Sequence, residues 1–427
     1  MLIRKYLVST LFLVLISSAS SASVITVGQT GKYDYQTIQE AVDASVDGDE
    51  IIVAPGVYTS STSWQPVVDI YNKNIWLHSS EGPDTTIIDG GQNKRGVQLY
   101  YGESNIEGFM IQNGSAIYSS GGGMRLYYAN PTITDCIFEN NNAGGSGYRG
   151  GYTYGGGAIL NEGGSPTIIG CVFRGNQASG NGGAIYNKYS SNSWIQDCLF
   201  ETNSAEKGGA ICNSSSSSCV LQVCSFQQNN ATFYGGAIYL VENCEVTITE
   251  SNIGNNYSDL GGGGIYNQGG ILAVTGSSFN QNVALPGNGG GISILGGGDA
   301  TVHYSEFTNN SAVGGGGIFV SASSMLGLGN SMFCENGGGD LLGDFNDLGG
   351  NEFNDSCSVT YGACCTNDIC VEIISETCVY VGGEFVGLGT LCVDDPCPSN
   401  CLGDVTGDGL VNVNDLLLII SVWGACP

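Results

Sequence analysis

A large apolar residue stands three positions before an asparagine eight times between residues 138 and 336. After a first interval of 35 residues, the steps between these motifs are 26 to 28 residues. The pairs are Phe138/Asn141, Phe173/Asn176, Phe200/Asn203, Phe226/Asn229, Ile253/Asn256, Phe279/Asn282, Phe307/Asn310 and Phe333/Asn336. Self-similarity at such a period is typical of a solenoid, in which each repeat buries its core by stacking on its neighbours.

A second motif keeps the same period. An apolar residue follows a Gly-rich pair or run at Met124, Ile159, Ile185, Ile211, Ile238, Ile265, Ile292 and Ile318. Glycine supplies the positive φ angles that a coil needs where it changes sheet. The two motifs together predict an all-β fold, a right-handed parallel β-helix.

Side chains two positions apart on a strand share a face. If the phenylalanines point inward, the positions two before them also point inward, and these hold Cys136, Cys171, Cys198, Cys224, Ser251, Ser277, Ser305 and Ser331. Consecutive thiols would lie ~4.8 Å apart. Two interpretations follow: a ladder of small buried residues, which we favour, or a metal or redox site. The asparagines of the first motif predict a second ladder, in which stacked amides bond from coil to coil.

Apolar residues at Ile38, Ala41, Val42 and Val46 predict a short amphipathic helix. A turn and a β-rich stretch follow, ending at Tyr58. The run 35–58 resembles the N-terminal entry of right-handed β-helix proteins of the pectate lyase and pectinesterase type. That resemblance implies that the helix plugs the open end of the first coil. The repeats Phe-x-x-Asn and Gly-Gly-Ala-Ile, over about residues 110–336, also resemble those of chlamydial polymorphic outer-membrane proteins, a resemblance that marks the fold.

The chain begins with Arg4 and Lys5, an apolar run and then small residues up to Ala22. This order is typical of a secretory signal peptide over residues 1–22, the alternative being a membrane anchor. We predict a secreted or cell-surface protein with no membrane span after cleavage. Removing the leader lowers the 11 Lys and Arg residues to 9 against 39 Asp and Glu, a formal net charge of −30. Such a charge disfavours nucleic acid as a partner.

The composition changes after residue 356, and nine of the 17 cysteines lie in the last 71 residues. In an exported chain this density indicates a disulfide module over 357–400, with a zinc site as the alternative. Cys334 with Cys357 and Cys401 with Cys426 are pairs suggested by the units they bracket. The remaining six cysteines allow 15 connectivities.

Residues 401–427 contain a calcium-loop pattern. Oxygen ligands recur at EF-hand-like spacing, Gly409 stands at the sharp turn, and an apolar run from Leu416 to Trp423 follows. The expected Ca²⁺ ligands are Asp404, Thr406, Asp408, the Leu410 carbonyl, Asn412 and Asp415. The loop resembles one half of a type I dockerin, which implies a cohesin-like partner. The alternatives are a calcium-stabilised cap and a tag read by a sorting system.

Two kinds of function fit a β-helix of this composition. Aromatic side chains suit sugar rings, and an outward column at Tyr186, Tyr239, Tyr266 and Phe319, extended by Tyr148, Tyr152 and Tyr154 of an inserted loop, predicts glycan binding. The alternative is aromatic packing that only stiffens the sheet.

The second function is catalysis. Asp135 and Asp197 lie two coils apart, ~9.6 Å by stacking, near the upper limit of the carboxylate separation in an inverting glycoside hydrolase. Acids scattered over a solvated face explain them equally well. We therefore predict a glycan-binding rod or adhesin. Its N-terminal cap and first coil occupy residues 23–58 and its β-helix repeats residues 59–356. Its calcium-binding tail attaches it to an envelope or extracellular complex. A polysaccharide lyase or glycoside hydrolase on the same fold is the alternative.

Overall fold

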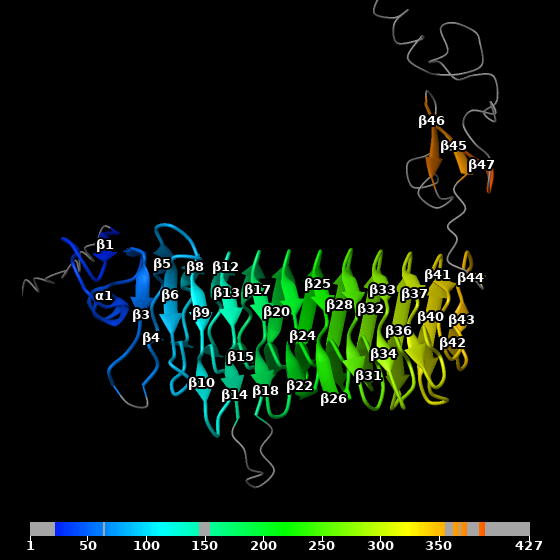
Figure 1. The fold of residues 1–427 in the computed structure, drawn as a ribbon, viewed down its shortest axis with the longest axis horizontal. Coiled ribbons are helices and arrows are strands. Elements are labelled where there is room, and N and C mark those ends of the chain that lie inside the picture. Colours follow the sequence, from blue (N-terminus) through cyan, green and yellow to red (C-terminus); the bar gives the residue numbers. More distant parts are fainter. Residues whose placement is uncertain are drawn as a thin grey trace, which may run out of the picture.

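The computed structural model describes residues 22–62, 65–144 and 154–354, and the backbone of three strands nearer the C-terminus. The described residues between 24 and 354 form a right-handed parallel β-solenoid of about eleven turns (Figure 1). Along the sequence, each full turn visits four sheets, which we call A, B, D and C in that order. This architecture confirms the fold predicted from the repeat.

The strands of each sheet are parallel to their neighbours and follow one another along the rod. Sheet A contains β1 (Val24–Val27), β2 (Glu50–Val53), β5 (Trp76–Ser79), β8 (Asn105–Glu107), β12 (Thr132–Thr134), β16 (Thr167–Ile169), β20 (Asn192–Gln196), β24 (Ser218–Gln222), β28 (Glu245–Thr249), β32 (Ile271–Thr275), β36 (Asp299–His303), β40 (Met325–Gly329) and β43 (Asn346–Asp347). Sheet B contains β3 (Gly56–Tyr58), β6 (Thr86–Asp89), β9 (Met110–Gln112), β13 (Ile137–Glu139), β17 (Val172–Arg174), β21 (Leu199–Glu201), β25 (Ser225–Gln227), β29 (Asn252–Gly254), β33 (Ser278–Asn280), β37 (Glu306–Thr308), β41 (Met332–Cys334) and β44 (Glu352–Asn354).

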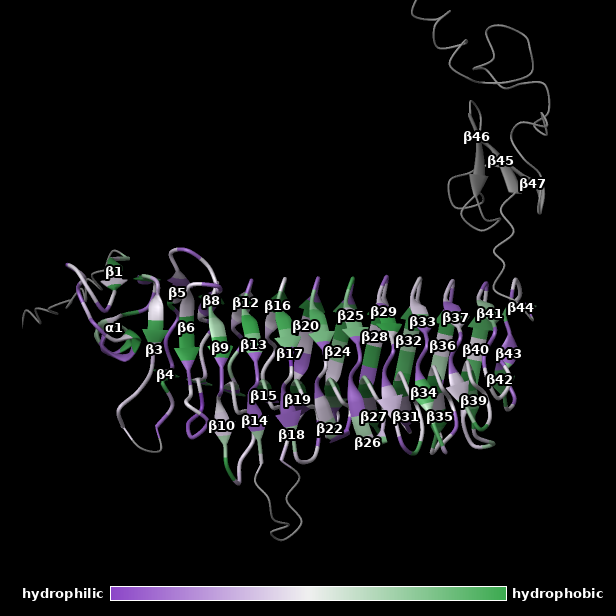
Figure 2. Ribbon diagram, in the orientation of Figure 1, coloured by the Kyte–Doolittle hydropathy of each residue, from purple (hydrophilic) through white to green (hydrophobic). Residues whose placement is uncertain are grey.

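The other two sheets complete each turn. Sheet D contains β10 (Ser115–Ala116), β14 (Asn142–Ala143), β18 (Gln177–Ala178), β22 (Ser204–Lys207), β26 (Asn230–Tyr234), β30 (Tyr257–Ser258), β34 (Val283–Ala284) and β38 (Ser311–Ala312). Sheet C contains β4 (Val68–Tyr71), β7 (Val97–Tyr100), β11 (Met124–Tyr127), β15 (Ile159–Glu162), β19 (Ile185–Lys188), β23 (Ile211–Asn213), β27 (Ile238–Val241), β31 (Ile265–Gln268), β35 (Ile292–Leu295), β39 (Ile318–Val320) and β42 (Leu341–Leu342). In Figure 2, strands such as β6 and β28 are mainly hydrophobic, whereas β18 is mainly hydrophilic.

The phenylalanines of the first motif stack inside the rod, as the alternation predicts. The rings of Phe138, Phe173, Phe200 and Phe226 lie 4.6–5.0 Å apart between centroids and within 7° of parallel. Ile253 occupies the next coil, and the stack resumes at Phe279. Stacking identical side chains on neighbouring coils gives each ring a dry apolar contact on both faces.

The asparagines of the first motif form a continuous buried ladder. Each Nδ2 donates to the Oδ1 of the next asparagine along the rod, over 2.9–3.0 Å from Asn141 to Asn336. The same Oδ1 also accepts a bond from the backbone amide of the preceding asparagine. This satisfies the buried amides, and the predicted ladder is confirmed.

A second, shorter amide ladder lies on the inner side of sheet C. Asn161 donates to Asn187, and Asn187 donates to Asn213, over 3.1 and 2.9 Å. Leu240 occupies the next rung, and the Nδ2 of Asn213 has no hydrogen-bond partner in the described structure. The ladder therefore ends on a buried, unpaired donor.

The predicted cysteine and serine column also lies inside the rod. Cys136, Cys171, Cys198 and Cys224 are at most 2 % exposed, and the serines that follow are at most 4 % exposed. Burial raises the pKa of Cys224 to about 12, so its thiol stays protonated near neutral pH. The described residues contain seven buried free thiols, the other three being Cys212, Cys219 and Cys244. These properties agree with the interpretation of small buried residues.

The described residues include one α-helix, α1 (Ile38–Ala44), at the N-terminal end of the rod (Figure 1). Thr37 and Glu40 form a capping box at its start, and Ile38, Ala41 and Val42 join the main core. Val46, predicted on the apolar face, is 49 % exposed because the helix ends at Ala44. That α1 acts as a plug stays a prediction.

The turn after α1 depends on a buried carboxylate. Asp49 is 2 % exposed and accepts bonds from the amides of Val46 and Ser23 over 2.9 and 2.8 Å. These bonds, the one from Val46 first, lower the pKa of Asp49 below its ordinary value of 3.8. The ionised side chain therefore fixes the entry to β2.

Beyond residue 354, the structure describes only an antiparallel sheet in the order β46 (Ile369–Ile373), β45 (Gly362–Thr366), β47 (Glu384–Leu388). This sheet falls within the predicted 357–400 module. Cys357, the partner suggested for Cys334, and the whole 401–427 unit lie outside the described residues. Within the described part of the protein, no helix is long and apolar enough to cross a membrane.

Candidate functional site

Five tyrosines gather where the first strands of sheet C end, and we call them the tyrosine platform. Tyr71, Tyr100 and Tyr127 are the last residues of β4, β7 and β11, and Tyr101 and Tyr128 begin the following turns. Their ring centroids lie 4.8–6.4 Å apart in six neighbouring pairs. Tyr71, Tyr101 and Tyr128 are 66, 41 and 48 % exposed. The platform is therefore a continuous aromatic surface open to solvent.

The backbone places the two turn tyrosines in an unfavourable conformation. Tyr101 and Tyr128 have φ angles of +59° and +48°, which cost a bulky residue about 1–2 kcal/mol each. Their amides donate to carbonyl oxygens of the next coil, over 2.9 Å to Tyr127 and 2.8 Å to Glu162, so the coil path enforces the conformation. The same conformation recurs at turns along the rod, for example at Thr202 and Val223, so it is a property of the solenoid path.

Gly163 occupies the equivalent turn on the next coil. Its φ is +72°, and a Cβ there would lie 2.5 Å from Cε1 of Tyr128. The glycine therefore leaves the space in which the Tyr128 ring lies. The platform ends on this coil, where Glu162 takes the position of the strand-ending tyrosines.

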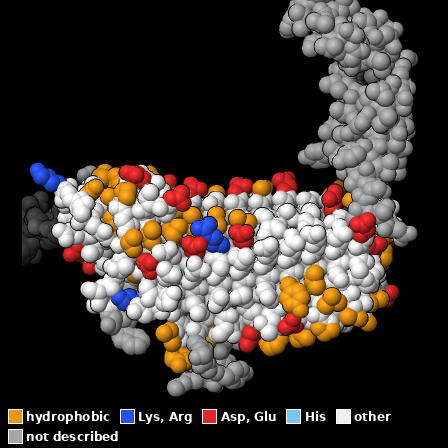
Figure 3. Space-filling model, in the orientation of Figure 1, with side chains coloured by type: hydrophobic (Ala, Val, Ile, Leu, Met, Phe, Trp, Pro, Cys, Tyr) orange, Lys and Arg blue, Asp and Glu red, His pale blue; other side chains and the backbone are white. Residues whose placement is uncertain are grey.

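Two cations and one carboxylate border the platform. The guanidinium of Arg125 lies 5.7 and 5.3 Å from the ring centroids of Tyr100 and Tyr127, a cation–π geometry. Its Nε also donates to Glu162 over 2.6 Å. Glu162 is 8 % exposed and pairs with Lys188 over 3.1 Å. This border has a net charge of +1 in a protein of net charge −28. On the face in Figure 3, by contrast, basic side chains are few and acidic ones are scattered.

The half-buried Arg95 lies at the corner between sheets D and C, at the opposite end of the sheet C strands from the platform. Arg95 donates to the carbonyl oxygens of Gly121 and Ser120 and to Oε1 of Gln98, over 2.6–2.9 Å. Burial lowers the pKa of Arg95 to about 10, so the guanidinium stays charged near neutral pH. Its three hydrogen bonds hold together the corner at which β7 and β11 begin.

The structure corrects the predicted aromatic column. Tyr186, Tyr239 and Tyr266 do point away from the main core, but they are only 6, 3 and 7 % exposed. They pack with Leu160 and Cys212 in a second hydrophobic cluster. Burial raises the pKa of Tyr239, and it raises the pKa of Tyr266 to about 12. The expectation of an exposed surface is therefore wrong for these three rings.

The burial has a clear cause. On each of these coils, one residue at or after the end of the sheet D strand forms a parallel backbone bridge with its counterpart on the next coil. These residues make a strip that covers the outer face of sheet C, and they are Gly155, Asn181, Lys207, Tyr234, Gly261 and Asn288. The ring of Tyr234 lies 4.4 Å from that of Tyr266. Lys207 lies over the ring of Tyr239 at 5.4 Å. Nothing in the spacing of the tyrosines reveals this strip.

The other predicted glycan-binding residues are only partly described. Phe319, in the same column, is half-buried, as is Tyr154. Tyr148 and Tyr152 lie outside the described residues. Glycan binding by any of these side chains stays a prediction.

The proposed catalytic carboxylates lie in one column of turns between sheets A and B. Asp135 and Asp197 are both exposed and have φ angles of +49° and +52°. Gly170 occupies the coil between them, and a Cβ there would lie 2.5 Å from Oδ1 of Asp135. Asp197 accepts a bond from Gln196 over 3.0 Å. The two residues thus share a column two coils apart, as the spacing indicates, and their catalytic role stays a prediction.

The predicted calcium ligands Asp404, Thr406, Asp408, Leu410, Asn412 and Asp415 lie outside the described residues. Among the residues that the structure does describe, no group of three or more His, Cys, Asp or Glu side chains is arranged to hold a metal ion.

The sequence matches the family model described as "Right handed beta helix region" over residues 74–232 and 152–303, more than half of the chain. The protein therefore belongs to this family of right-handed β-helices. Residues 304–321 also match the repeat of chlamydial polymorphic membrane proteins. No curated protein matches the sequence.

Among solved structures, the fold is similar to that of the pectate lyase Pel9A, with 15 % identity, a TM-score of 0.44 and coverage of 81 % of this chain and 84 % of that one. A pectin methylesterase from carrot is similar at 15 % identity and a TM-score of 0.32, covering 68 % of this chain and 84 % of that one. A pectin methylesterase from Aspergillus niger has 14 % identity, a TM-score of 0.21 and coverage of 79 and 86 %.

Proposed function

We propose that this protein is a secreted polysaccharide-binding rod that holds glycans on its tyrosine platform. The observation that carries the proposal is the contiguous exposure of Tyr71, Tyr101 and Tyr128 around two supporting rings. Flat rings with a hydroxyl at the rim combine apolar area with hydrogen bonding, as sugar rings require. The platform replaces the buried tyrosine column as the expected binding surface.

The rigidity of the surroundings supports the same proposal. Arg125 bonds to Glu162 and lies over two platform rings, and Gly163 leaves space for a third. Side chains that are ordered before binding lose little conformational entropy when a ligand docks. A parallel β-helix provides such support because each coil is bonded to both neighbours.

The tail is the proposed means of attachment. Loop residues of the types found at 404–415 bind Ca²⁺ through carboxylate and carbonyl oxygens, and the ordered loop would present the following apolar segment to a cohesin-like or sorting partner. Calorimetric titration of the full-length protein with Ca²⁺ tests this part. One saturable site that is lost in Asp408→Ala is expected, and identical titration of the variant would contradict it.

The second candidate is a polysaccharide-degrading enzyme. The observation that favours it is the common column of Asp135 and Asp197, both exposed at turns between sheets A and B. Such a pair could supply a general acid and a general base if a polysaccharide lay across these turns. Its platform would then serve to hold substrate.

One experiment separates the two functions. The mature protein is run through gels that contain single polysaccharides and is also incubated with the same polymers, with release of reducing ends and unsaturated products followed over time. Retention without product is expected for the binding rod. Product that disappears in Asp135→Asn and Asp197→Asn variants would establish the enzyme, and the absence of both retention and product would contradict each function.

A further inference from the structure

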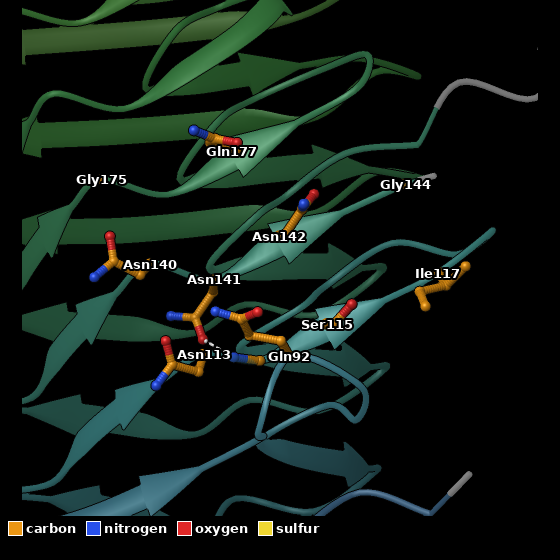
Figure 4. A pocket seen from close by; sticks show the side chains of 11 residues that line it. Gln92, Asn113, Ser115, Ile117, Asn140, Asn141, Asn142, Gly144, Gly175 and Gln177 are labelled. Carbon is orange, nitrogen blue, oxygen red and sulfur yellow. Dashed lines mark hydrogen bonds between the residues drawn. The ribbon is translucent and has the colours of Figure 1, made fainter. Parts of the chain in front are cut away.

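A polar cleft opens at the corner where sheet B gives way to sheet D, on the coils of β9, β13 and β17. Its volume is about 530 Å³. We call it the amide cleft after the amide side chains in its lining: Gln92, Asn113, Asn140, Asn142 and Gln177, together with Asn141 of the buried ladder. Figure 4 shows these side chains projecting from successive turns and strands of the rod. The platform is at the corner between sheets C and A, so the two sites are separate.

Most of these amides have unused hydrogen-bonding capacity. The side chains of Gln92, Asn140, Asn142 and Gln177 are exposed, and within the described structure they take part in no hydrogen bond. Asn141, between two of them in sequence, points inward and belongs to the buried ladder. Each free amide offers two donor hydrogens and one acceptor oxygen. The cleft can therefore bind groups that both donate and accept.

The cleft is also uncharged. The residues that line it are Asn, Gln, Ser, Gly and Ile. The nearest carboxylate in the hydrogen-bond network, Asp89, accepts bonds from Gln112 and Asn113 over 2.7 and 3.1 Å. No lining side chain offers a positive charge, so an anionic ligand would find no counter-charge here, in a protein that is already strongly acidic.

The polar groups repeat along the rod. Ser115, Asn142 and Gln177 are register partners on β10, β14 and β18, so their side chains recur every ~4.8 Å. Asn113 and Asn140 form a second column at the preceding turns, with φ angles of +52° and +53°. The cleft thus presents a regular series of amides to a ligand lying parallel to the rod axis.

The next residue in the turn column is Gly175, with a φ of +63°. A Cβ at this position would lie 2.7 Å from Oδ1 of Asn140. The glycine leaves room for the Asn140 amide within the cleft. Ile117, which is 51 % exposed, adds an apolar edge. An amide-lined cleft with one apolar edge suits a ring that carries several hydroxyl groups.

From this geometry we infer that the amide cleft binds a neutral, hydroxyl-rich oligosaccharide along the rod axis. The inference deepens the proposed function, on which it rests, by naming an uncharged class of glycan and a second contact for it. Hydroxyl groups match the donor and acceptor pairs of the free amides. The repeat of the amides allows successive sugar units of one oligosaccharide to be bound in the same way.

Calorimetric titration of the mature full-length protein tests the inference. The probes are the hexasaccharides of cellulose, xylan, mannan and starch, with hexagalacturonate as the anionic counterpart. Saturable binding of at least one neutral hexasaccharide is expected. The double variant Asn142→Leu/Gln177→Leu, which removes two amides and keeps their volume, should raise Kd about tenfold or more, about 1.4 kcal/mol per factor of ten. Asn140→Asp, which introduces a charge at constant size, should also raise Kd.

Asn230→Leu is the matched control, because Asn230 occupies the same sheet D position two coils beyond Gln177 and is exposed outside the cleft. Its Kd should equal that of the unmodified protein. The inference is overturned if no neutral hexasaccharide binds, if only hexagalacturonate binds, or if the cleft variants bind as tightly as the control. If Tyr101→Ala/Tyr128→Ala abolishes retention of polymers while the cleft variants retain them normally, the platform function stands and the cleft inference falls.

Discussion

Replacing Asn229 by alanine should destabilise the rod strongly, because its buried amide bonds to the coils on both sides. Its Nδ2 donates to the carbonyl of Phe200 over 2.9 Å and to Oδ1 of Asn256 over 3.0 Å. Its Oδ1 accepts bonds of 3.0 Å from both the backbone amide and the Nδ2 of Asn203. The substitution removes all four bonds and leaves the backbone amide of Asn203 buried without a partner.

At a net value of about 1 kcal/mol for each hydrogen bond, the loss of unfolding free energy should be about 3–5 kcal/mol. Urea unfolding followed by circular dichroism and tyrosine fluorescence measures it, with the slope against urea compared between variants. Asn230→Ala is the control: the neighbouring side chain is exposed, and the expected change is within about 0.5 kcal/mol. A loss below about 1 kcal/mol for Asn229→Ala would refute the view that the amide ladder stabilises the stack.

Three further predictions concern single positions. Leu240→Asn should destabilise the protein by about 1–2 kcal/mol less than Leu99→Asn in the same urea assay. Only the first substitution places an acceptor next to the unpaired Nδ2 of Asn213. Equal losses of unfolding free energy would contradict this. Gly163→Ala should weaken both stability and glycan retention. Gly276→Ala is the control, because its φ of +59° is similar and no atom lies closer than 3.9 Å to the added Cβ; it should leave glycan retention unchanged. Equal retention in the two variants would contradict a role for Gly163 in placing the ring of Tyr128. The lowered pKa of Asp49 contributes stability that is present above its unfolded pKa near 3.8 and is lost as the pH falls through the folded pKa. Asp49→Asn should therefore be less stable than the unmodified protein at pH 7 and approach its stability in acid. A difference in unfolding free energy that does not change with pH would refute this linkage.

The interior of the rod could be predicted from the sequence because it repeats. The motif that contains Phe173 and Asn176 recurs in steps of 26 to 28 residues along the following coils. In a parallel stack, the side chains at each position of such a motif all point the same way, into the core or away from it. The same reasoning gave the right direction for Tyr239, away from the main core. It could not give the burial of that ring, since the covering strip comes from a different part of each coil.

The tyrosine platform was missed because it lies at the start of the regular repeats, where only Tyr127 and Tyr128 follow a copy of the second motif, at Met124. The signal was nonetheless present as Leu99-Tyr100-Tyr101 and Leu126-Tyr127-Tyr128, two copies of one motif separated by 27 positions, with Ile70-Tyr71 before them. A repeat of this length predicts stacking on neighbouring coils. The amide cleft was less accessible, because whether Asn140 is free or bonded depends on neighbours in space.

The most direct test of the account is the affinity of the platform for glycan. Tyr101→Ala/Tyr128→Ala is compared with Tyr257→Ala/Tyr304→Ala, which removes two tyrosines that are 38 and 61 % exposed elsewhere on the rod. Stacking contacts worth about 0.5–1.5 kcal/mol each predict a Kd raised about fivefold to a hundredfold for the platform variant and unchanged for the control. Equal affinity in both variants would contradict the assignment of the platform as the binding surface.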